Sequence, residues 1–253
     1  MNDKAIKPMT ILASLPYFLI SSVLIYLGLY VITPIFMNRG IPFATLYLVL
    51  FQFLPFALLL ITALILYQKE GNAWNIADFK SRMRLNPLNK TDWFCIIGII
   101  LCYLIIMSLL TPVINQAAQI PFFSPPDFFP AELNPNKTAV PGLVMGSDIS
   151  GQYWVIVLYF LGWASNILGE EFLWRGIILP RQIKQYGPKA WIMHAILWGL
   201  WHFFWKWQLV GIIPFSFILT YAAYKRKNTW IGMIAHGTLN AIPLIMIIIS
   251  VFQ

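Results

Sequence analysis

Charged residues are scarce in this chain of 253 residues. They make up 10% of it, whereas hydrophobic residues make up 59%. Soluble domains usually carry about 25% charged residues. The chain therefore has too few charges to cover the surface of an ordinary soluble domain. Long uncharged runs remain, and roughly 20 apolar residues suffice for a helix to cross a bilayer.

These runs predict an all-α fold, a polytopic transmembrane helix bundle of about seven spans. The spans are expected at residues 11–33, 45–67, 93–113, 152–173, 190–205, 208–224 and 229–251. The fifth and sixth are short, so one of them should be tilted, broken or re-entrant. The alternating pattern of a membrane barrel is absent. The first run lacks a small-residue cleavage site, so we expect it to remain as a membrane anchor.

Several other signals are missing. The sequence has no internal repeat, no glycine-rich phosphate loop and no cysteine metal knuckle. Its two cysteines, Cys95 and Cys102, both fall in the third span. Two helical turns place them about 10 Å apart, too far for a disulfide. We therefore expect both to be packing or lipid-facing residues.

The net charge of +8 would by itself allow nucleic-acid binding. The distribution of the cations favours membrane topology instead. With a cytoplasmic N-terminus, every Lys and Arg from Lys4 to Lys227 falls on the cytoplasmic side, except Arg39, Lys137 and Lys206. This asymmetry follows the positive-inside rule. It predicts a cytoplasmic N-terminus and no nucleic-acid partner.

We divide the chain into N-terminal spans and a C-terminal core. A basic cytoplasmic loop is expected to be solvated rather than to bind lipid or a partner. A proline-rich outer loop should be irregular, because proline interrupts helices, with its phenylalanines on the membrane surface or over the bundle. The boundaries are 1–149 for the N-terminal part, 150–253 for the core, 68–92 for the basic loop and 111–152 for the outer loop.

Ionisable residues inside membrane spans are costly and indicate function. The stretch "GEEFLWRG" holds Glu170, Glu171 and Arg175. Glu171 and Arg175 are four positions apart and share a helix face, so they are expected to pair. Glu170 is rotated about 100° away and is free to face a cavity. A carboxylate partly stripped of water suits a general base. The alternative is a solvated helix end.

Two further spans carry polar residues. In "HAILWGLWH", His202 follows Trp198 by one helical turn, whereas His194 is interpreted as a packing or interfacial histidine. In "HGTLN", His236 and Asn240 lie four apart on one helix face. Such a stripe requires a shared polar partner. It serves either a site or hydrogen bonding between helices.

Taken together, E-E-x-x-x-R, aromatic-x-x-x-H and H-x-x-x-N, in this order on successive hydrophobic segments, resemble the CPBP family. This is the CAAX prenyl endopeptidase-like, or Abi, group of intramembrane proteases. The resemblance covers residues 150–250, and the earlier spans resemble the family only in being hydrophobic. The sequence departs from the pattern at Trp198, where the family usually has phenylalanine.

The resemblance implies a role for each motif residue. Glu170 and His202 would activate the attacking water, and His236 and Asn240 would stabilise the oxyanion. Glu171 and Arg175 would be the supporting pair. A metal-free reaction without a cofactor is expected. If zinc bound, Glu170, His202 and His236 would be its ligands.

We therefore expect an intramembrane endopeptidase that hydrolyses a peptide bond of a membrane-associated protein or peptide in the lipid bilayer. Two other functions remain open at this point. One is a non-catalytic membrane immunity or scaffold protein of the same family. The other is a small transporter, although the absence of two similar halves argues against one built from repeats.

Overall fold

The computed structural model describes residues 6–253 of the chain. Every regular element in that part is a helix. Six helices there are long and apolar enough to cross a membrane: Ile11–Met37, Phe43–Lys69, Lys90–Ala117, Tyr153–Tyr186, Ala190–Arg226 and Thr229–Val251. The predicted all-α bundle is confirmed. The chain is a multi-pass integral membrane protein.

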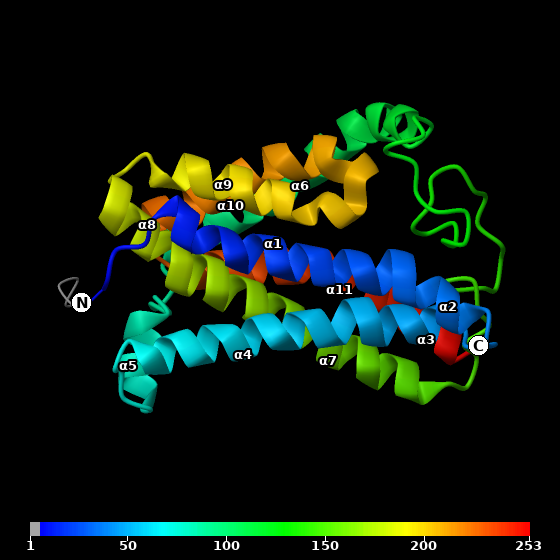
Figure 1. The fold of residues 1–253 in the computed structure, drawn as a ribbon, viewed down its shortest axis with the longest axis horizontal. Coiled ribbons are helices and arrows are strands. Elements are labelled where there is room, and N and C mark those ends of the chain that lie inside the picture. Colours follow the sequence, from blue (N-terminus) through cyan, green and yellow to red (C-terminus); the bar gives the residue numbers. More distant parts are fainter. Residues whose placement is uncertain (1–5) are drawn as a thin grey trace.

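Most of these long helices contain a change of helical pitch (Figure 1). The first consists of α1 (Ile11–Leu27), η1 (Gly28–Ile32) and α2 (Thr33–Met37), and the second of α3 (Phe43–Leu46), η2 (Tyr47–Phe53) and α4 (Leu54–Lys69). The short α5 (Ile76–Arg82) and the long α6 (Lys90–Ala117) follow. The fourth helix comprises α7 (Tyr153–Glu170), η3 (Glu171–Ile178) and α8 (Leu179–Tyr186). The last elements are α9 (Ala190–Trp201), η4 (His202–Gln208), α10 (Leu209–Arg226) and α11 (Thr229–Val251).

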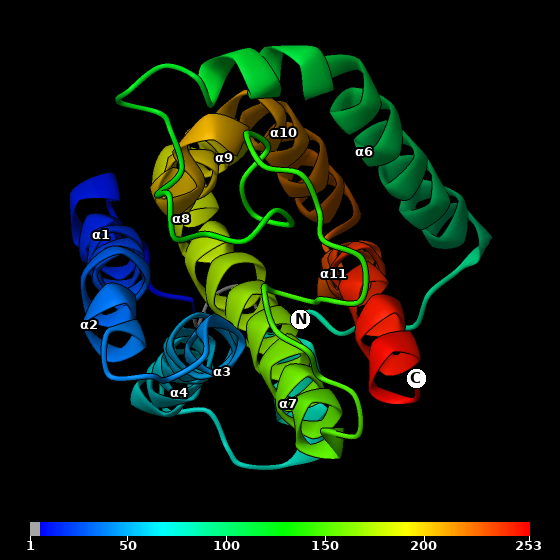
Figure 2. The same cartoon turned by 90° about the vertical axis from the view of Figure 1, so that its right-hand side faces the viewer.

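The predicted fifth and sixth spans are the two legs of a helical hairpin. The chain bends within η4, where Trp205 leaves helical geometry with φ −110° and ψ 54°. After the bend, α10 lies beside α9 (Figures 1 and 2). The α9 leg has 12 residues, or about 18 Å at 1.5 Å per residue. It is too short to cross a hydrocarbon core of about 30 Å, so η4 turns back inside the bundle.

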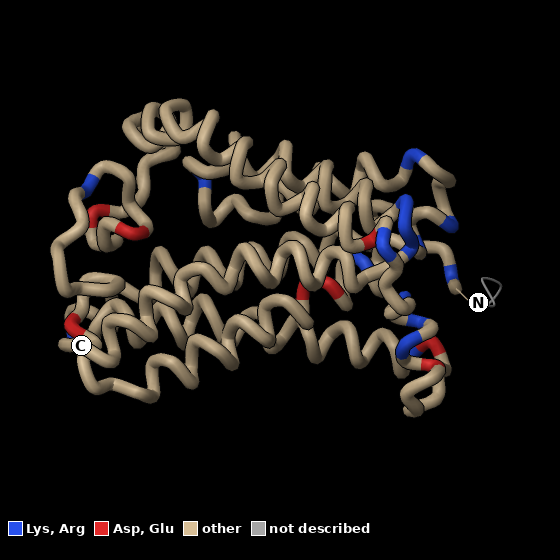
Figure 3. The backbone as a smooth tube through the Cα atoms, turned by 180° about the vertical axis from the view of Figure 1, so that it is seen from behind, with Lys and Arg blue, Asp and Glu red and all other residues tan. Residues whose placement is uncertain are grey.

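Cationic residues mark one end of the bundle (Figure 3). Lys and Arg gather where the described chain begins, and the C-terminus lies at the opposite end (Figures 1 and 3). This arrangement follows because successive long segments alternate in direction and their number is odd when the two legs of the hairpin are counted separately. Lys4, part of the predicted basic side, lies outside the described residues.

The outer faces of the bundle are apolar, as lipid contact requires. Large exposed hydrophobic side chains occur on several helices, among them Leu12, Ile61, Phe94, Leu109 and Ile245. Contiguous exposed apolar surface of this kind indicates a membrane environment. Cys95 is partly buried, Cys102 is exposed and both are free thiols, as predicted.

Helix α7 runs between α4 and α11 and brings the first motif into the interior (Figure 2). A glycine near its end permits this close packing. A Cβ atom added at Gly169 would lie 2.5 Å from the carbonyl oxygen of Phe56 on α4. Small residues let membrane helices approach closely. The motif glutamates that follow Gly169 are therefore held against neighbouring helices.

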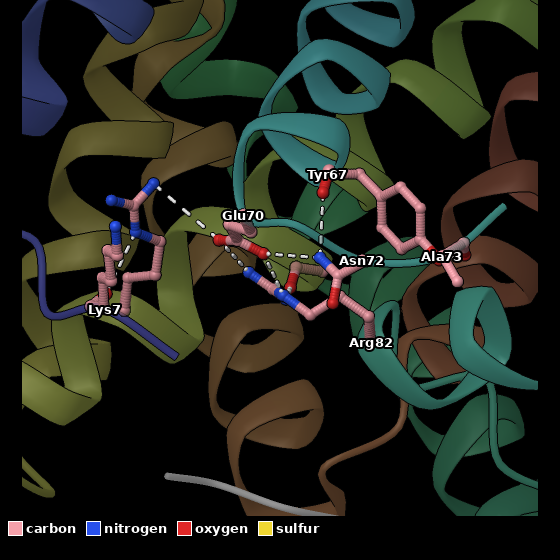
Figure 4. Close-up of polar contacts among 8 residues, drawn as sticks. Lys7, Tyr67, Glu70, Asn72, Ala73 and Arg82 are labelled. Carbon is pink, nitrogen blue, oxygen red and sulfur yellow. Dashed lines mark hydrogen bonds and ion pairs between the residues drawn. The ribbon is translucent and has the colours of Figure 1, made fainter. Parts of the chain in front are cut away.

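Most of the basic loop is exposed, as expected, but its middle is packed against the bundle, which corrects the expectation for Arg82 and Met83. Its helix α5 ends at Arg82, which is only 7% exposed. The Arg82 guanidinium binds both carboxylate oxygens of Glu70 (Figure 4). It also donates to the carbonyl oxygen of Gly176 in η3. Met83 is fully buried beside Gly176. The loop thus braces the helix that carries the first motif.

The outer loop begins later than predicted, because α6 continues through Pro112 to Ala117. The loop caps the bundle through Phe129, which is 0% exposed. Its ring packs against Trp205 and Trp207 of η4. Phe122 is 62% exposed on the outside. The loop phenylalanines therefore divide between the two predicted positions.

Candidate active site

The first motif lies where α7 changes into η3. Glu170 is the last residue of α7, and η3 is π-helical from Glu171 to Ile178. Such π-helical turns are often found at functional sites. Glu170 is 1% exposed, and Glu171 is fully buried. The alternative of a solvated helix end is therefore wrong.

The Glu170 carboxylate is held by two neutral donors. Asn166, one turn earlier on α7, donates from Nδ2 to Oε1 over 3.1 Å. Trp198 on α9 donates from its indole Nε1 to Oε2 over 2.8 Å. Tryptophan at this position therefore does more than replace the bulk of phenylalanine, because phenylalanine has no N–H to donate. Both oxygens of this buried carboxylate are thereby hydrogen-bonded.

The predicted pair of Glu171 and Arg175 is present. Arg175 Nη1 lies 3.1 Å from Glu171 Oε1, and both side chains have 0% exposure. The Arg175 guanidinium also lies over the Trp198 ring, 3.9 Å from its centroid. Arg175 therefore links the first and second motifs through a cation–π contact.

Glu171 has an additional partner that was not predicted. His236 Nδ1 on α11 lies 3.2 Å from Glu171 Oε1. A carboxylate only accepts hydrogen bonds, so Nδ1 carries the proton. His236 Nε2 is then free to accept, and Asn240 Nδ2 lies 3.1 Å from it. The arrangement fits a neutral imidazole held between a carboxylate and an amide.

Helix α11 can approach Glu171 because residue 232 is a glycine. A Cβ atom added at Gly232 would lie 2.1 Å from Glu171 Oε2. Glu171 is fully buried and paired, so it cannot move aside. A side chain of any size at residue 232 would push α11 away from the first motif.

We expect Gly232→Ala to destabilise the protein by about 1–3 kcal/mol, the usual cost of overpacking. It should also lower activity, because His236 follows Gly232 by one turn of α11. Thermal unfolding in detergent measures the first effect. The matched control is Gly98→Ala on α6, where an added Cβ would meet nothing within 4 Å. Equal unfolding temperatures for the two variants would contradict the prediction.

His202 begins η4, directly after α9. Its Nδ1 lies 2.9 Å from the carbonyl oxygen of Trp198. Carbonyls accept, so Nδ1 donates and Nε2 presents a lone pair. The rings of Trp198 and Trp201 pack edge-on against the imidazole at centroid distances of 5.0 and 4.7 Å. The aromatic residue of the second motif thus fixes the histidine through both its backbone and its ring.

All four predicted catalytic residues line one cavity of about 280 Å³. The cavity lies among the middle helices and contains both polar groups and aromatic rings. Besides Glu170, His202, His236 and Asn240, its lining includes Gln52, Asn166, Gln208, Tyr47, Phe51, Tyr103, Tyr159, Trp198, Trp205 and Phe215. The two supporting residues, Glu171 and Arg175, lie behind this lining.

His194 is outside the cavity lining, consistent with a packing role. It is 0% exposed. Its Nδ1 lies 2.7 Å from Gln182 Oε1, and Gln182 Nε2 donates to Ser14 Oγ over 2.9 Å. The Phe18 ring packs edge-on against it. His194 therefore joins α1, α8 and α9 rather than contributing to the site.

Residues 152–242 match a family model described as "Rce1-like: Type II CAAX prenyl endopeptidase Rce1-like". The matched part of the chain is therefore similar to the CAAX prenyl endopeptidase-like (CPBP) family. The matched residues contain all three motifs, and the resemblance seen in the sequence is confirmed. No curated protein and no solved structure matched the chain.

Asn166 is a residue of this site that the sequence motifs did not reveal. It is 5% exposed and contacts two motif residues, since it also accepts from Asn240 Nδ2 over 3.0 Å. Its spacing from Glu170 is one helical turn, which is a usable signal. Asparagine is common near helix ends and loops, however, so the spacing alone did not distinguish it.

The donor set of this site fits zinc poorly. Among residues 6–253, no three His, Cys, Asp or Glu side chains lie close enough together to hold a metal ion. Both Glu170 oxygens accept N–H groups, and both His236 nitrogens are engaged by Glu171 and Asn240. Zinc binding would require these hydrogen bonds to break. Two of the three residues predicted as zinc ligands, Glu170 and His236, are thus already engaged, and only His202 keeps a free ring nitrogen.

Proposed function

We propose that this protein is an intramembrane endopeptidase that hydrolyses a peptide bond of a membrane-associated protein or peptide. The observation that supports this best is the convergence of a buried carboxylate, two imidazoles and an amide on one cavity. Buried ionisable groups in a membrane protein are costly and indicate chemistry or transport. The family description, an endopeptidase, favours hydrolysis.

In this proposal Glu170 is the general base. It takes a proton from water, and the hydroxide oxygen forms a bond to the carbonyl carbon of the substrate. His202 Nε2, with its lone pair, accepts a hydrogen bond from the same water and orients it. Glu170 then passes this proton to the leaving nitrogen as the C–N bond breaks, which leaves a carboxylic acid and an amine and returns Glu170 to its carboxylate form.

Asn240 Nδ2 stabilises the oxyanion that forms in the first step, and His236 Nε2, which accepts from the same amide, holds it in place. The oxyanion role that the resemblance implies for His236 itself would require a proton on Nε2, because Nδ1–H is bound to Glu171. Preorganised donors act strongly in a site that excludes water, and removing one typically costs about 2.7–4 kcal/mol. The Asn240 amide donates to Asn166 and lies against His236 before substrate binds. The substrate oxygen would replace one of these acceptors. Little side-chain motion is then required during the reaction.

The test is reconstitution of the purified protein in liposomes with quenched-fluorescent reporter peptides. The panel should contain the same peptide with a prenyl anchor, with an acyl anchor and without an anchor. Cleavage of an anchored peptide by the wild type, with a defined scissile bond in mass spectrometry, supports the proposal. A wild type that folds and cleaves no peptide in the panel contradicts it and favours a non-catalytic role.

We further expect hydrolysis to be independent of a bound metal, because Glu170 and both nitrogens of His236 are already hydrogen-bonded. Chelators should leave kcat within about two-fold of its value without chelator. If a zinc-bound water were the nucleophile, removal of the metal would instead abolish cleavage. Elemental analysis of the purified protein checks the same point. Stoichiometric zinc, whose removal abolishes cleavage and whose return restores it, would overturn this expectation.

A further inference from the structure

Asn166 completes a chain of hydrogen bonds between the Glu170 and Glu171 carboxylates. The chain runs through His236 and Asn240 of the third motif. Glu171 Oε1 accepts from His236 Nδ1, and His236 Nε2 accepts from Asn240 Nδ2. The second N–H of the same Asn240 amide donates to Asn166 Oδ1. Asn166 Nδ2 then donates to Glu170 Oε1. The result is one continuous chain of hydrogen bonds between Glu171 and Glu170.

The direction of every bond in this chain is fixed by its ends. A carboxylate at each end can only accept. Asn166 must therefore donate toward Glu170 and accept from Asn240. Only a group with one acceptor and one donor at these two positions completes the chain, and an asparagine amide has that geometry. An aspartate of the same shape would face Glu170 with a second carboxylate.

The bond to Asn166 is not required to hold α7 against α11. Two other side chains on α7 already make this connection. Tyr159 donates its hydroxyl to the carbonyl oxygen of Asn240 over 3.0 Å, and Trp163 Nε1 donates to that of Gly237 over 2.9 Å. Hydrogen bonds of this kind serve helix assembly. Asn166 instead ends on the carboxylate of Glu170, inside the cavity.

We propose that Asn166 is a positioning residue for the hydrolysis proposed above, on which this inference rests. It fixes the Glu170 carboxylate with one oxygen toward the indole of Trp198 and the other toward the third motif. It also orients the Asn240 amide, so that the base and the oxyanion donors keep one relative geometry. Displacing a reacting group by about 1 Å can cost about 10²-fold in rate.

The experiment compares Asn166→Ala and Asn166→Asp with the wild type on the anchored reporter peptide that the wild type cleaves. We expect kcat to fall about ten- to hundred-fold for Asn166→Ala, with KM changed less than about two-fold. Asn166→Asp, although isosteric, should be at least as slow, because its carboxylate repels Glu170. The matched control is Ser165→Ala, the neighbouring and half-buried residue on α7. It should keep wild-type kinetics.

A double-mutant cycle with Asn240→Ala separates positioning from general packing. If both residues act through one chain, the double variant loses little more activity than the worse single variant. Multiplied losses in the double variant would overturn the proposal. So would wild-type kcat in Asn166→Asp, which retains the shape of the side chain. Unfolding temperatures of all variants must stay near that of the wild type for the comparison to apply.

The outcomes distinguish this inference from the proposed function. Suppose that the wild type cleaves the reporter, that Glu170→Gln does not, and that Asn166→Asp cleaves it with wild-type kcat. The proposed protease function then stands, and the positioning role of Asn166 is wrong. If the wild type cleaves nothing, the proposed function itself fails.

Discussion

Glu170→Gln is expected to lower kcat for peptide hydrolysis by about 10²–10⁴-fold, the range that a general base usually contributes. Glutamine keeps the size of the side chain and can still accept from Trp198 Nε1, which now donates over 2.8 Å. It cannot take a proton from water. Binding of the substrate should therefore change much less than turnover, and KM should stay near its wild-type value.

Steady-state cleavage of the anchored reporter peptide in liposomes checks this prediction. The matched control is Asp148→Asn, which removes an exposed carboxylate of the outer loop. It should retain wild-type activity. A Glu170→Gln protein that is folded and cleaves at the wild-type rate would remove Glu170 from the mechanism.

Arg175→Met is expected to destabilise the protein by about 3–5 kcal/mol, because it leaves the buried Glu171 carboxylate without its cation. The pair has 0% exposure on both sides, so water cannot replace the lost partner. Methionine keeps part of the apolar contact with Trp198 but loses the cation–π interaction. Reversible unfolding in mixed detergent measures the difference in the free energy of unfolding.

Removing the Glu171 charge as well tests whether the unpaired buried carboxylate causes the loss of stability. Glu171→Gln combined with Arg175→Met should recover part of the lost stability, because no unpaired charge then remains buried. Arg39→Met is the control: this exposed arginine lies 5.5 Å from the Phe36 ring, and its loss should cost less than about 0.5 kcal/mol. A double variant less stable than Arg175→Met would contradict the electrostatic explanation.

The largest features of the fold follow from the sequence, because each depends on residues close together in the chain. Length and hydrophobicity of the uncharged runs predict the helices, and the basic loops predict which end faces the cytoplasm. The short fifth run predicts the hairpin leg α9, although the sequence does not show where it turns. The pair of Glu171 and Arg175 also follows from spacing, since both lie on one turn of one helix.

The expectation that the basic loop is solvated failed at Arg82 for a specific reason. Its charge suggested solvent, but Arg82 is buried against Glu70 and reaches the Gly176 carbonyl on a distant helix. A sequence pattern reports how polar a residue is and says little about which partner neutralises it. Burial of an arginine is possible only when such partners meet in the folded chain.

The sequence by itself determined which residues are candidates for the site, because carboxylates, imidazoles and amides are unusual inside apolar helices. The tertiary structure decided how they are connected. The Trp198 indole that donates to Glu170, the glycine at 232 that admits Glu171 and the amide of Asn166 that links Glu170 to Asn240 are contacts between segments far apart in the chain. Such contacts depend on how α7, α9 and α11 approach one another, which no local pattern encodes.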